Sequence, residues 1–593
     1  MCGIVGFASK SNIDTDILYK MMKKIEHRGP DAEGIYVNKK IKLGHRRLIV
    51  VDPEGGIQPM IYKSNKDFVI VYNGELYNAD ELRKKLIEQG ENFVTKSDTE
   101  VVLKSYVNWG RDCVNYLDGI FAFAIFDEGN NKIFLARDRF GVKPLFYHYD
   151  ENNFVFASEI KSLLEYPEIS SDVDENGLCE ILALGPARTF GNGIFKDIDE
   201  LEPGHFLEFE NGKIKNGRYF ELKYEAHTED LNETAQHVRY LLSEAIKKQL
   251  VSDVPIGTFL SGGLDSSIIS AIAATQIQNL NTFSLSFKDN EKYFVKSIFQ
   301  PDSDDEWVEK VQKFIGSDHH KIILDSLESA YALEKSMVMR DLPGMADIDS
   351  SMLLFCQQIK KYVTVAISGE CADEIFGGYP WYYRQDLKTD GFPWTRDLSV
   401  RQSILKINLD LESYSHEKYL QALKNAPEFP EDDPDEKYIR DMFYLNVTYF
   451  MGNLLERKDR MSMANGLEVR VPFCDHNLIQ YVYNIPWSMK FYNGREKGIL
   501  RLAMKNILPE DILWRKKSPY PKTYHPQYTQ LICKMLVDEL KNSPLLDVIN
   551  KEKLFELVNT KKPWYGQLMS GPQLMGYFFQ LSRWFKDYNI NLC

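Results

Sequence analysis

Cysteine is scarce in this chain, and the few cysteines fit none of the arrangements that build structural sites. Eight cysteines occur among 593 residues. They form no Cys-x-x-Cys pair and no cluster with histidine at the spacing of a zinc site. The sequence therefore predicts reduced thiols and a cytoplasmic protein.

Long apolar runs and an excess of positive charge are missing as well. No stretch of about 18 consecutive apolar residues is present, and no basic segment precedes an apolar run at the start of the chain. The formal net charge of −14 argues against a general nucleic-acid-binding surface. We therefore expect neither a membrane nor a nucleic acid among the partners of this protein.

What the chain does have is the composition of a folded protein with more than one domain. Hydrophobic residues make up 44% and charged residues 27% of the sequence, which is ordinary for a globular protein. The length exceeds what one hydrophobic core normally holds. Short apolar runs alternate with turn signals at 4–8, 68–72, 121–126, 132–136 and 154–157. They predict a sheet-rich α+β domain over residues 2–210.

The pattern changes after a polar stretch at 226–233, and we expect a linker at 211–235. Residues 238–246 then follow the spacing of an amphipathic helix. Strand-like runs at 256–260, 282–287 and 362–367 alternate with helical segments, which is typical of a parallel sheet. Residues 236–593 are therefore expected to form an α/β domain whose last part, beyond Gly378, is helical.

The second residue is a cysteine, which becomes the amino terminus once the initiator methionine is removed. Cys2 then carries a thiol and an α-amine on one carbon. The amine, whose pKa in an unstructured peptide is about 7.7–8.0, can act as the base that activates the thiol. The chain therefore begins with a candidate N-terminal nucleophile.

Three further segments supply the groups that glutamine hydrolysis needs. Asn73, Gly74 and Glu75 follow a predicted strand, where a side-chain amide and a backbone N–H can stabilise an oxyanion. Arg47 can bind an α-carboxylate through two parallel bonds, and Asp98 can accept an α-ammonium group. Taken singly, these residues are also typical of a turn, a surface charge and a helix N-cap.

Together these residues resemble the class II glutamine amidotransferases, and so do residues 27–31 (HRGPD) and 137–145 (RDRFGVKPL). The resemblance covers roughly the first 210 residues. It implies an Ntn-hydrolase-like αββα sandwich in which Cys2 attacks the side-chain amide of glutamine. The glutamine-binding residues that it implies are Arg47, Asn73, Gly74, Glu75 and Asp98.

A glycine-rich loop at 261–267 (SGGLDSS) follows a predicted strand and opens a helix, where backbone N–H groups can surround an anion. It lacks the GxxxxGK[ST] spacing of loops that serve transfer of the terminal phosphate. It resembles the PP-loop of ATP pyrophosphatases, which implies attack at the α-phosphorus and release of pyrophosphate. The ATP-binding residues implied are Leu260, Ser261, Gly262, Gly263, Leu264, Asp265, Ser266, Ser267, Ser286, Ser368 and Gly369.

A second segment, 368–379 (SGECADEIFGGY), comes at the end of the third predicted strand. Open α/β sheets bind ligands at this edge. Asp265 and Asp373 are suited to hold Mg²⁺, which prefers oxygen ligands. Lys497, within 494–501 (GREKGILR), can neutralise the charge that develops at the α-phosphorus.

These segments and residues 465–473 (NGLEVRVPF) resemble the synthetase domain of glutamine-dependent asparagine synthetases, so the resemblance spans nearly the whole chain. It implies that the β-carboxylate of aspartate is activated as an acyl-adenylate and that ammonia reaches it through an internal tunnel. Glu370 matches a glutamate that assists ammonia attack, and 282–287 matches a strand that lines the adenine pocket. The implied substrates are L-glutamine, L-aspartate and ATP with Mg²⁺, and a homodimer is expected.

The sequence leaves open which carboxylate accepts the ammonia. Cys371 stands where glycine is usual, and residues 341–351 are unlike the usual sequence near the acceptor pocket. Arg457 can pair with a substrate carboxylate. The alternatives are amidation of another carboxylate, such as a cell-wall precursor or a natural-product peptide, and a catalytically silent storage or interaction protein. A β-lactam-forming cyclase is disfavoured, because ring closure needs no ammonia.

Overall fold

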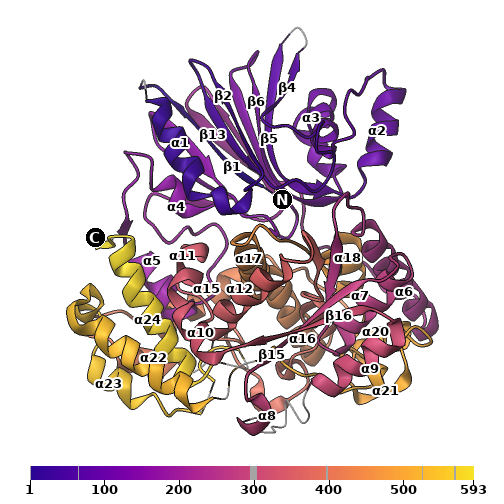
Figure 1. Cartoon of the computed structure of the whole chain (residues 1–593), viewed down its shortest axis with the longest axis vertical. Helices are drawn as coiled ribbons and strands as arrows, with labels where there is room; N and C mark the ends of the chain where they lie inside the picture. The colour runs from indigo at the N-terminus through magenta and orange to yellow at the C-terminus, as the bar shows by residue number, and fades with distance from the viewer. Residues whose placement is uncertain are drawn as a thin grey trace.

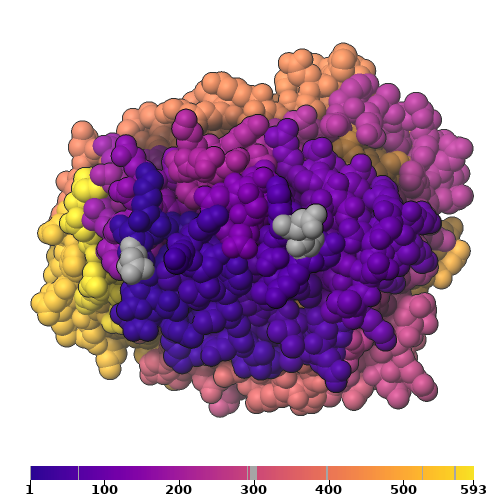
Figure 2. All heavy atoms as spheres, turned by 90° about the horizontal axis from the view of Figure 1, so that it is seen from above, coloured from indigo at the N-terminus to yellow at the C-terminus, as the bar shows by residue number. Residues whose placement is uncertain are grey.

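A computed structural model describes residues 2–11, 13–63, 66–293, 304–395, 398–521, 523, 525–561, 563–566 and 569–593. The N-terminal half forms an upper layered body and the C-terminal half a larger lower body, with the start of the chain at their junction (Figure 1). Seen from above, the N-terminal half covers the centre of the molecule and the C-terminal half extends around it (Figure 2). Of the helices in the described part of the chain, none combines the length and apolar composition that a membrane crossing requires.

Two six-stranded antiparallel sheets pack face to face in the N-terminal half. Alternate residues of their strands, such as Ile4, Val71 and Phe156, point inward and are fully buried between the sheets. The first sheet has the order β11 (Asp199–Glu200), β8 (Phe146–Tyr149), β9 (Asn153–Ala157), β1 (Gly3–Ser9), β3 (Lys42–Arg47), β2 (Ala32–Val37). The second has the order β13 (Lys213–Arg218), β12 (His205–Glu210), β7 (Lys132–Arg137), β6 (Gly119–Asp127), β5 (Asp67–Leu76), β4 (Met60–Lys63).

Helices cover both outer faces of this sandwich. α1 (Thr15–Lys24) and the short α4 (Ile160–Leu163) lie on the first sheet, and α2 (Ala79–Glu88) and α3 (Asp98–Trp109) lie on the second. α1 begins at an Asp14 side chain that accepts the N–H of Asp16, and it ends in two lysines, which suits the helix dipole. The predicted αββα sandwich is confirmed.

The C-terminal half contains a five-stranded parallel sheet. Its order is β16 (Asp318–Leu324), β15 (Asn281–Phe287), β14 (Ile256–Phe259), β17 (Val365–Ile367), β18 (Glu468–Arg470). The chain leaves β14 toward β15 on one side and returns to β17 on the other. The loops after β14 and β17 therefore meet at a topological switch point, where α/β sheets bind ligands.

Helices flank this sheet and make up the rest of the lower body, so the predicted parallel sheet with a helical end is confirmed (Figure 1). Before the last strand they are α6 (Leu231–Lys248), α7 (Leu264–Ala274), α8 (Asn290–Tyr293), α9 (Asp305–Ile315), α10 (Ser326–Tyr331), α11 (Leu333–Arg340), α12 (Asp347–Ile359), α13 (Ala372–Phe376), α14 (Leu398–Ser403), α15 (Leu411–Leu423), α16 (Pro434–Leu445) and α17 (Met451–Met463). After it come α18 (His476–Asn484), α19 (Trp487–Lys490), α20 (Gly498–Ala503), α21 (Glu510–Leu513), α22 (Pro526–Glu539), α23 (Lys551–Glu556) and α24 (Gly571–Asp587).

The C-terminal end also returns to the N-terminal half. β19 (Asn591–Leu592) pairs in parallel with β10 (Asp172–Val173). α5 (Glu175–Cys179) lies among the helices of the lower body (Figure 1), and the hydroxyl of Tyr577 on α24 donates to the carbonyl of Ile181 at 2.7 Å. Residues before 210 therefore contribute to both bodies.

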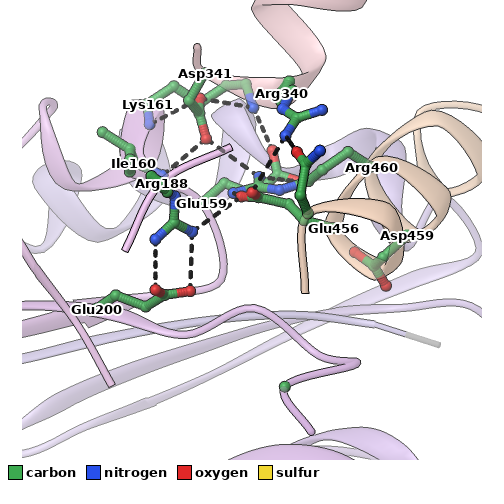
Figure 3. Close-up of polar contacts among 12 residues, drawn as sticks. Glu159, Ile160, Lys161, Arg188, Glu200, Arg340, Asp341, Glu456, Asp459 and Arg460 are labelled. Carbon is green, nitrogen blue, oxygen red and sulfur yellow. Dashed lines mark hydrogen bonds and ion pairs between the residues drawn. The ribbon is translucent and has the colours of Figure 1, made fainter. Parts of the chain in front are cut away.

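A buried cluster of charged side chains joins the two halves (Figure 3). Arg460 of α17 lies 3.1 Å from both Glu159 and Asp341. Asp341 in turn accepts the backbone N–H groups of Ile160 and Lys161 at 3.0 and 3.1 Å, so a residue of the lower body caps α4 of the upper one. The interface between the halves therefore contains paired charges removed from water.

The sequence predictions differ from the structure in a few elements. The run at 362–367 forms a strand only from Val365, and Tyr362 is half exposed. Residues 213–218 fall in the expected linker at 211–235 but form strand β13. Since β13 extends the second sheet past residue 210, we propose the domain boundary between Arg218 and Leu231.

The interface charges make a prediction about stability. Asp341→Asn keeps the size of the side chain but removes the counter-charge of Lys161 and Arg460, which are buried. We expect the free energy of unfolding to fall by about 3–5 kcal/mol, as for a broken buried ion pair.

Urea unfolding followed by tryptophan fluorescence measures this change. Asp435→Asn, which removes an exposed partner of Lys388, is the control and should cost no more than about 1 kcal/mol. Equal effects of the two substitutions would contradict the importance of the interface charges.

Candidate active sites

Cys2 lies at the start of β1, against the middle of β5. Its side chain is buried, with 8% of the residue exposed, and its backbone nitrogen donates to Oδ1 of Asn73 at 2.9 Å. Burial raises the pKa of the thiol, and a hydrogen bond from the backbone of Leu48 opposes that rise. A base is therefore needed to generate the thiolate.

Asn73 has an amide group with one end occupied and the other without a partner. Its Oδ1 accepts from Cys2, whereas no hydrogen bond to Nδ2 is found among the described residues, although Asn73 is fully buried. An unpaired buried donor costs stability, and such a donor beside a nucleophile is what an oxyanion hole requires. Asn73, Gly74 and Glu75 lie within β5, not after it, which corrects the sequence prediction.

The remaining glutamine-site candidates lie around this strand. Asp98 accepts the N–H of Leu76 at 3.0 Å and the hydroxyl of Tyr72 at 3.2 Å, and the N-cap of α3 is Ser97 instead of Asp98. Asp98 is therefore oriented toward β5, as a substrate-binding role requires.

Arg47 is buried at the end of β3, so it is no surface charge. Its guanidinium donates to the carbonyls of Pro53 and Asp52 at 2.8 and 2.7 Å. These bonds fix the orientation of the side chain.

A residue of the C-terminal half that was not among the predicted site residues contacts strand β5. Arg470 of β18 lies 3.2 Å from Glu75 and 2.6 Å from Glu468. Its backbone carbonyl accepts the N–H of Ser368, the first residue of the loop after β17. One residue therefore contacts both a glutamine-site candidate and the nucleotide-site loop.

The loops after β14 and β17 border a cavity of about 200 Å³. Gly262 has a φ of +67°, and a Cβ there would lie 2.7 Å from the backbone of Trp307, so only glycine fits the turn. Six of the predicted ATP-binding residues line the cavity, namely Leu260, Ser261, Asp265, Ser266, Ser368 and Gly369. From β15, Ser284 and Leu285 line it, and the predicted Ser286 is not among its described lining residues.

Two carboxylates and two lysines converge at the edge of this cavity. Lys497 lies 2.6 Å from Asp265 and 2.5 Å from Asp373, and Lys517 lies 2.7 Å from Asp373. Burial opposes the charge of Lys497, but both carboxylates outweigh it and raise its pKa, so the ammonium is stable. Lys497 was predicted; Lys517, in a Lys-Lys-Ser-Pro segment without a motif, was not.

The pair Asp265 and Asp373 fits a divalent cation. Oδ1 of Asp265 is buried and has no hydrogen-bond partner among the described residues. Carboxylate oxygens are the ligands that Mg²⁺ prefers, and one or two from the protein suffice when phosphates supply the others.

Glu370 occupies the boundary between this cavity and a smaller one of about 130 Å³ that Met345, Trp381 and Leu454 line. It pairs with Arg457 at 2.6 Å and with Lys458 at 3.0 Å. Burial would raise the pKa of Glu370, but Lys458 and Arg457 outweigh burial and lower it. Arg457 is only 4% exposed and lines both cavities, so it is not a surface charge.

The backbone at Cys371 shows why glycine is the usual residue at this position. Cys371 has a φ of +77°, a left-handed conformation that favours glycine. The thiol side chain is buried and extends away from open solvent. Cysteine is therefore tolerated here at some cost in backbone strain.

Comparisons with known proteins agree with this arrangement. A model of the glutamine amidotransferase domain family matches residues 1–220, and a model of the asparagine synthase family matches residues 237–586. The chain is 47% identical to asparagine synthetase [glutamine-hydrolyzing] 3 of Bacillus subtilis (strain 168), with 100% of both chains covered.

Two other relatives are more distant. Asparagine synthetase [glutamine-hydrolyzing] 1 of the same organism is 32% identical, over 88% of this chain and 87% of its own. Asparagine synthetase [glutamine-hydrolyzing] of Cricetulus griseus is 30% identical, over 88% of this chain and 84% of its own. With both domain families matched in the order that the fold displays, this chain belongs to the glutamine-hydrolysing asparagine synthetases.

Proposed function

We propose that this protein converts L-aspartate to L-asparagine, using glutamine as the nitrogen donor and ATP as the source of energy. The observation that carries the proposal is that one chain holds both sets of groups: Cys2 beside the unpartnered amide of Asn73, and Asp265, Asp373 and Lys497 beside the PP-loop cavity. The products of the proposed reaction are asparagine, glutamate, AMP and pyrophosphate.

In the N-terminal site, the thiol of Cys2 attacks the side-chain amide carbon of glutamine. The α-amine of the processed chain takes the thiol proton and returns it to the leaving ammonia. Water then hydrolyses the glutamyl thioester, which releases glutamate and the free thiol of Cys2. Nδ2 of Asn73 and the N–H of Gly74 stabilise the oxyanion, and each such donor is worth about 10²–10³ in rate. Arg47 binds the α-carboxylate of glutamine, and Asp98 and Glu75 bind its α-ammonium.

In the C-terminal site, the PP-loop holds the β- and γ-phosphates of ATP while an oxygen of the β-carboxylate of aspartate attacks the α-phosphorus. The bond from that phosphorus to the bridging oxygen breaks, so β-aspartyl-AMP forms and pyrophosphate leaves. Lys497 stabilises the charge that develops at the α-phosphorus. The residues proposed to bind ATP are Leu260, Ser261, Gly262, Gly263, Leu264, Asp265, Ser266, Ser267, Ser286, Ser368 and Gly369.

Asp265 and Asp373 would hold Mg²⁺, which neutralises the pyrophosphate leaving group. Lys497 pairs with both carboxylates, which keeps its ammonium at the edge of the cavity where the α-phosphate would bind. Lys517 stays near Asp373 and adds positive charge at the same edge of the cavity.

Ammonia then attacks the acyl carbon of the adenylate and displaces AMP. We assign Glu370 to accept a proton from the attacking nitrogen, and Arg457 to bind a carboxylate of aspartate. Since free ammonia in water at neutral pH is mostly ammonium, delivery through the protein interior keeps it nucleophilic. The second candidate function is amidation of a different carboxylate, because Arg457 and Lys458 would bind that group in the same way.

Association into a homodimer stays a prediction.

The role of Cys2 can be separated from that of the synthetase site. Cys2→Ala removes the nucleophile but leaves the PP-loop cavity intact, because Cys2 is not among its lining residues. We expect glutamine-dependent asparagine formation to fall by at least about a thousandfold, while synthesis from ammonium chloride continues. Mass spectrometry of asparagine and an enzymatic assay of glutamate measure both; retained glutamate formation would contradict the assignment of Cys2.

A substitution in the pair Asp265 and Asp373 should impair the synthetase reaction and leave glutamine hydrolysis intact. Asp265→Asn removes a charge that would bind Mg²⁺, so pyrophosphate release in the presence of aspartate should fall about 10²–10³-fold with either nitrogen source. Glutamine hydrolysis should persist. Asp511→Asn, at an exposed pair with Lys310, is the control and should change neither rate. A wild type that hydrolyses glutamine but releases no pyrophosphate in response to aspartate would favour another acceptor.

A further inference from the structure

Helix α17 carries consecutive residues that contact Glu370 of the synthetase site and Arg28 of the N-terminal half. Arg457 and Lys458 form ion pairs with Glu370 at 2.6 and 3.0 Å. The next residue, Asp459, lies 2.8 Å from Arg28 of the N-terminal half. All residues of α17 except Glu456 are buried, so these contacts are shielded from water.

Arg28 connects Asp459 to the candidate nucleophile, Cys2. Its Nε donates to the backbone carbonyl of Cys2 at 3.0 Å, and its Nη1 lies 2.9 Å from Glu159 and 2.8 Å from Asp459. The side chain is fully buried. Two carboxylates, one from each half of the molecule, therefore set the position of the guanidinium that holds Cys2.

We propose that Asp459 is a positioning residue that couples the synthetase site to the glutaminase site, acting through Arg28 on the backbone of Cys2. The inference rests on the proposed function, because it takes Cys2 and Glu370 as members of two reacting sites. It adds a route by which occupancy of one site changes the rate at the other.

The coupling follows from competition for the cations of α17. A carboxylate of the acceptor, or the phosphate of its adenylate, attracts Arg457 and Lys458 away from Glu370. A ligand shifts a conformation only through contacts that differ between two states. Here the two states differ in the partner of Arg457 and Lys458, which is Glu370 in the free site and the ligand anion in the occupied site. Since a helix is stiff over one turn, Asp459 moves with its neighbours.

A displacement of Asp459 changes the balance between the two carboxylates that hold Arg28. Arg28 is out of contact with solvent, so a displaced Asp459 cannot be replaced by water. The guanidinium then shifts toward Glu159, and its bond to the Cys2 carbonyl changes. Lys143 of the N-terminal half also lies 3.2 Å from Asp459, so a shift of this carboxylate changes that ion pair as well.

Glu456 on the same helix offers a matched control. It lies 3.3 Å from Arg188 and 3.7 Å from Arg340, within the same charge cluster (Figure 3). None of its ion-pair partners among the described residues holds Cys2. Its third partner, Arg460, lies 3.7 Å away and also pairs with Glu159. Glu456→Gln therefore removes the same charge from the same helix and leaves the contacts of Asp459 with Arg28 and Lys143 in place.

The experiment measures kcat and KM for glutamine hydrolysis with and without saturating aspartate, Mg²⁺ and a non-hydrolysable ATP analogue. In the wild type we expect the two kcat values to differ by about fivefold or more, the lower end of coupling between sites. In Asp459→Asn the ratio should be close to one, with KM for glutamine unchanged because Arg47 and Asp98 are not contacted. Glu456→Gln should keep the wild-type ratio.

A second variant tests the inference if Asp459→Asn does not fold. Asp459→Asn combined with Lys143→Met removes one charge of each sign and should give the same ratio near one. Asp459→Glu, which keeps the charge, should restore part of the coupling, which a purely structural role would not predict.

The outcomes separate the inference from the proposed function. A wild-type ratio of one, or an unchanged ratio in Asp459→Asn, would overturn the inference alone. Absence of glutaminase activity, or of aspartate-dependent pyrophosphate release, in the wild type would remove the proposed function and this inference together.

Discussion

The pairing of buried charges across the interface is the constraint on which the rest of the molecule depends. Arg28, Asp341 and Arg460 are fully removed from water and find their counter-charges in the opposite half. Moving such groups out of water is costly, and removing one partner leaves an uncompensated charge. The two halves therefore stabilise each other, and the geometry of each site includes residues that belong to the other.

This constraint explains where the sites lie. Cys2 begins a strand of the upper sandwich at the junction of the two bodies, and the loops after β14 and β17 end at the carboxyl edge of the lower sheet. Between them lie α17 and β18, which carry Asp459 and Arg470. An enzyme that must deliver a reactive small molecule from one site to the other gains from such a rigid, dry junction.

Features with a local cause could be predicted from the sequence, and features set by long-range packing could not. The nucleotide loop could be predicted because the SGGLDSS segment follows a strand and opens a helix, and Gly262 adopts the left-handed turn that such a loop needs. The short apolar runs predicted a sheet-rich domain, whereas its two layers were implied by the family resemblance alone. Lys517, Lys458 and Arg470 were missed, because their roles depend on partners more than 80 residues away in the chain. The position of Asn73 inside β5 was missed because an Asn-Gly pair is typical of turns.

The central claim is that the two sites act as one unit, with ammonia passing inside the protein. The most direct test supplies glutamine labelled with ¹⁵N in its side-chain amide, together with an excess of unlabelled ammonium, and measures the ¹⁵N content of the asparagine formed. The account predicts that asparagine keeps nearly the enrichment of the glutamine amide. Asparagine with the enrichment of the bulk ammonium pool would contradict it.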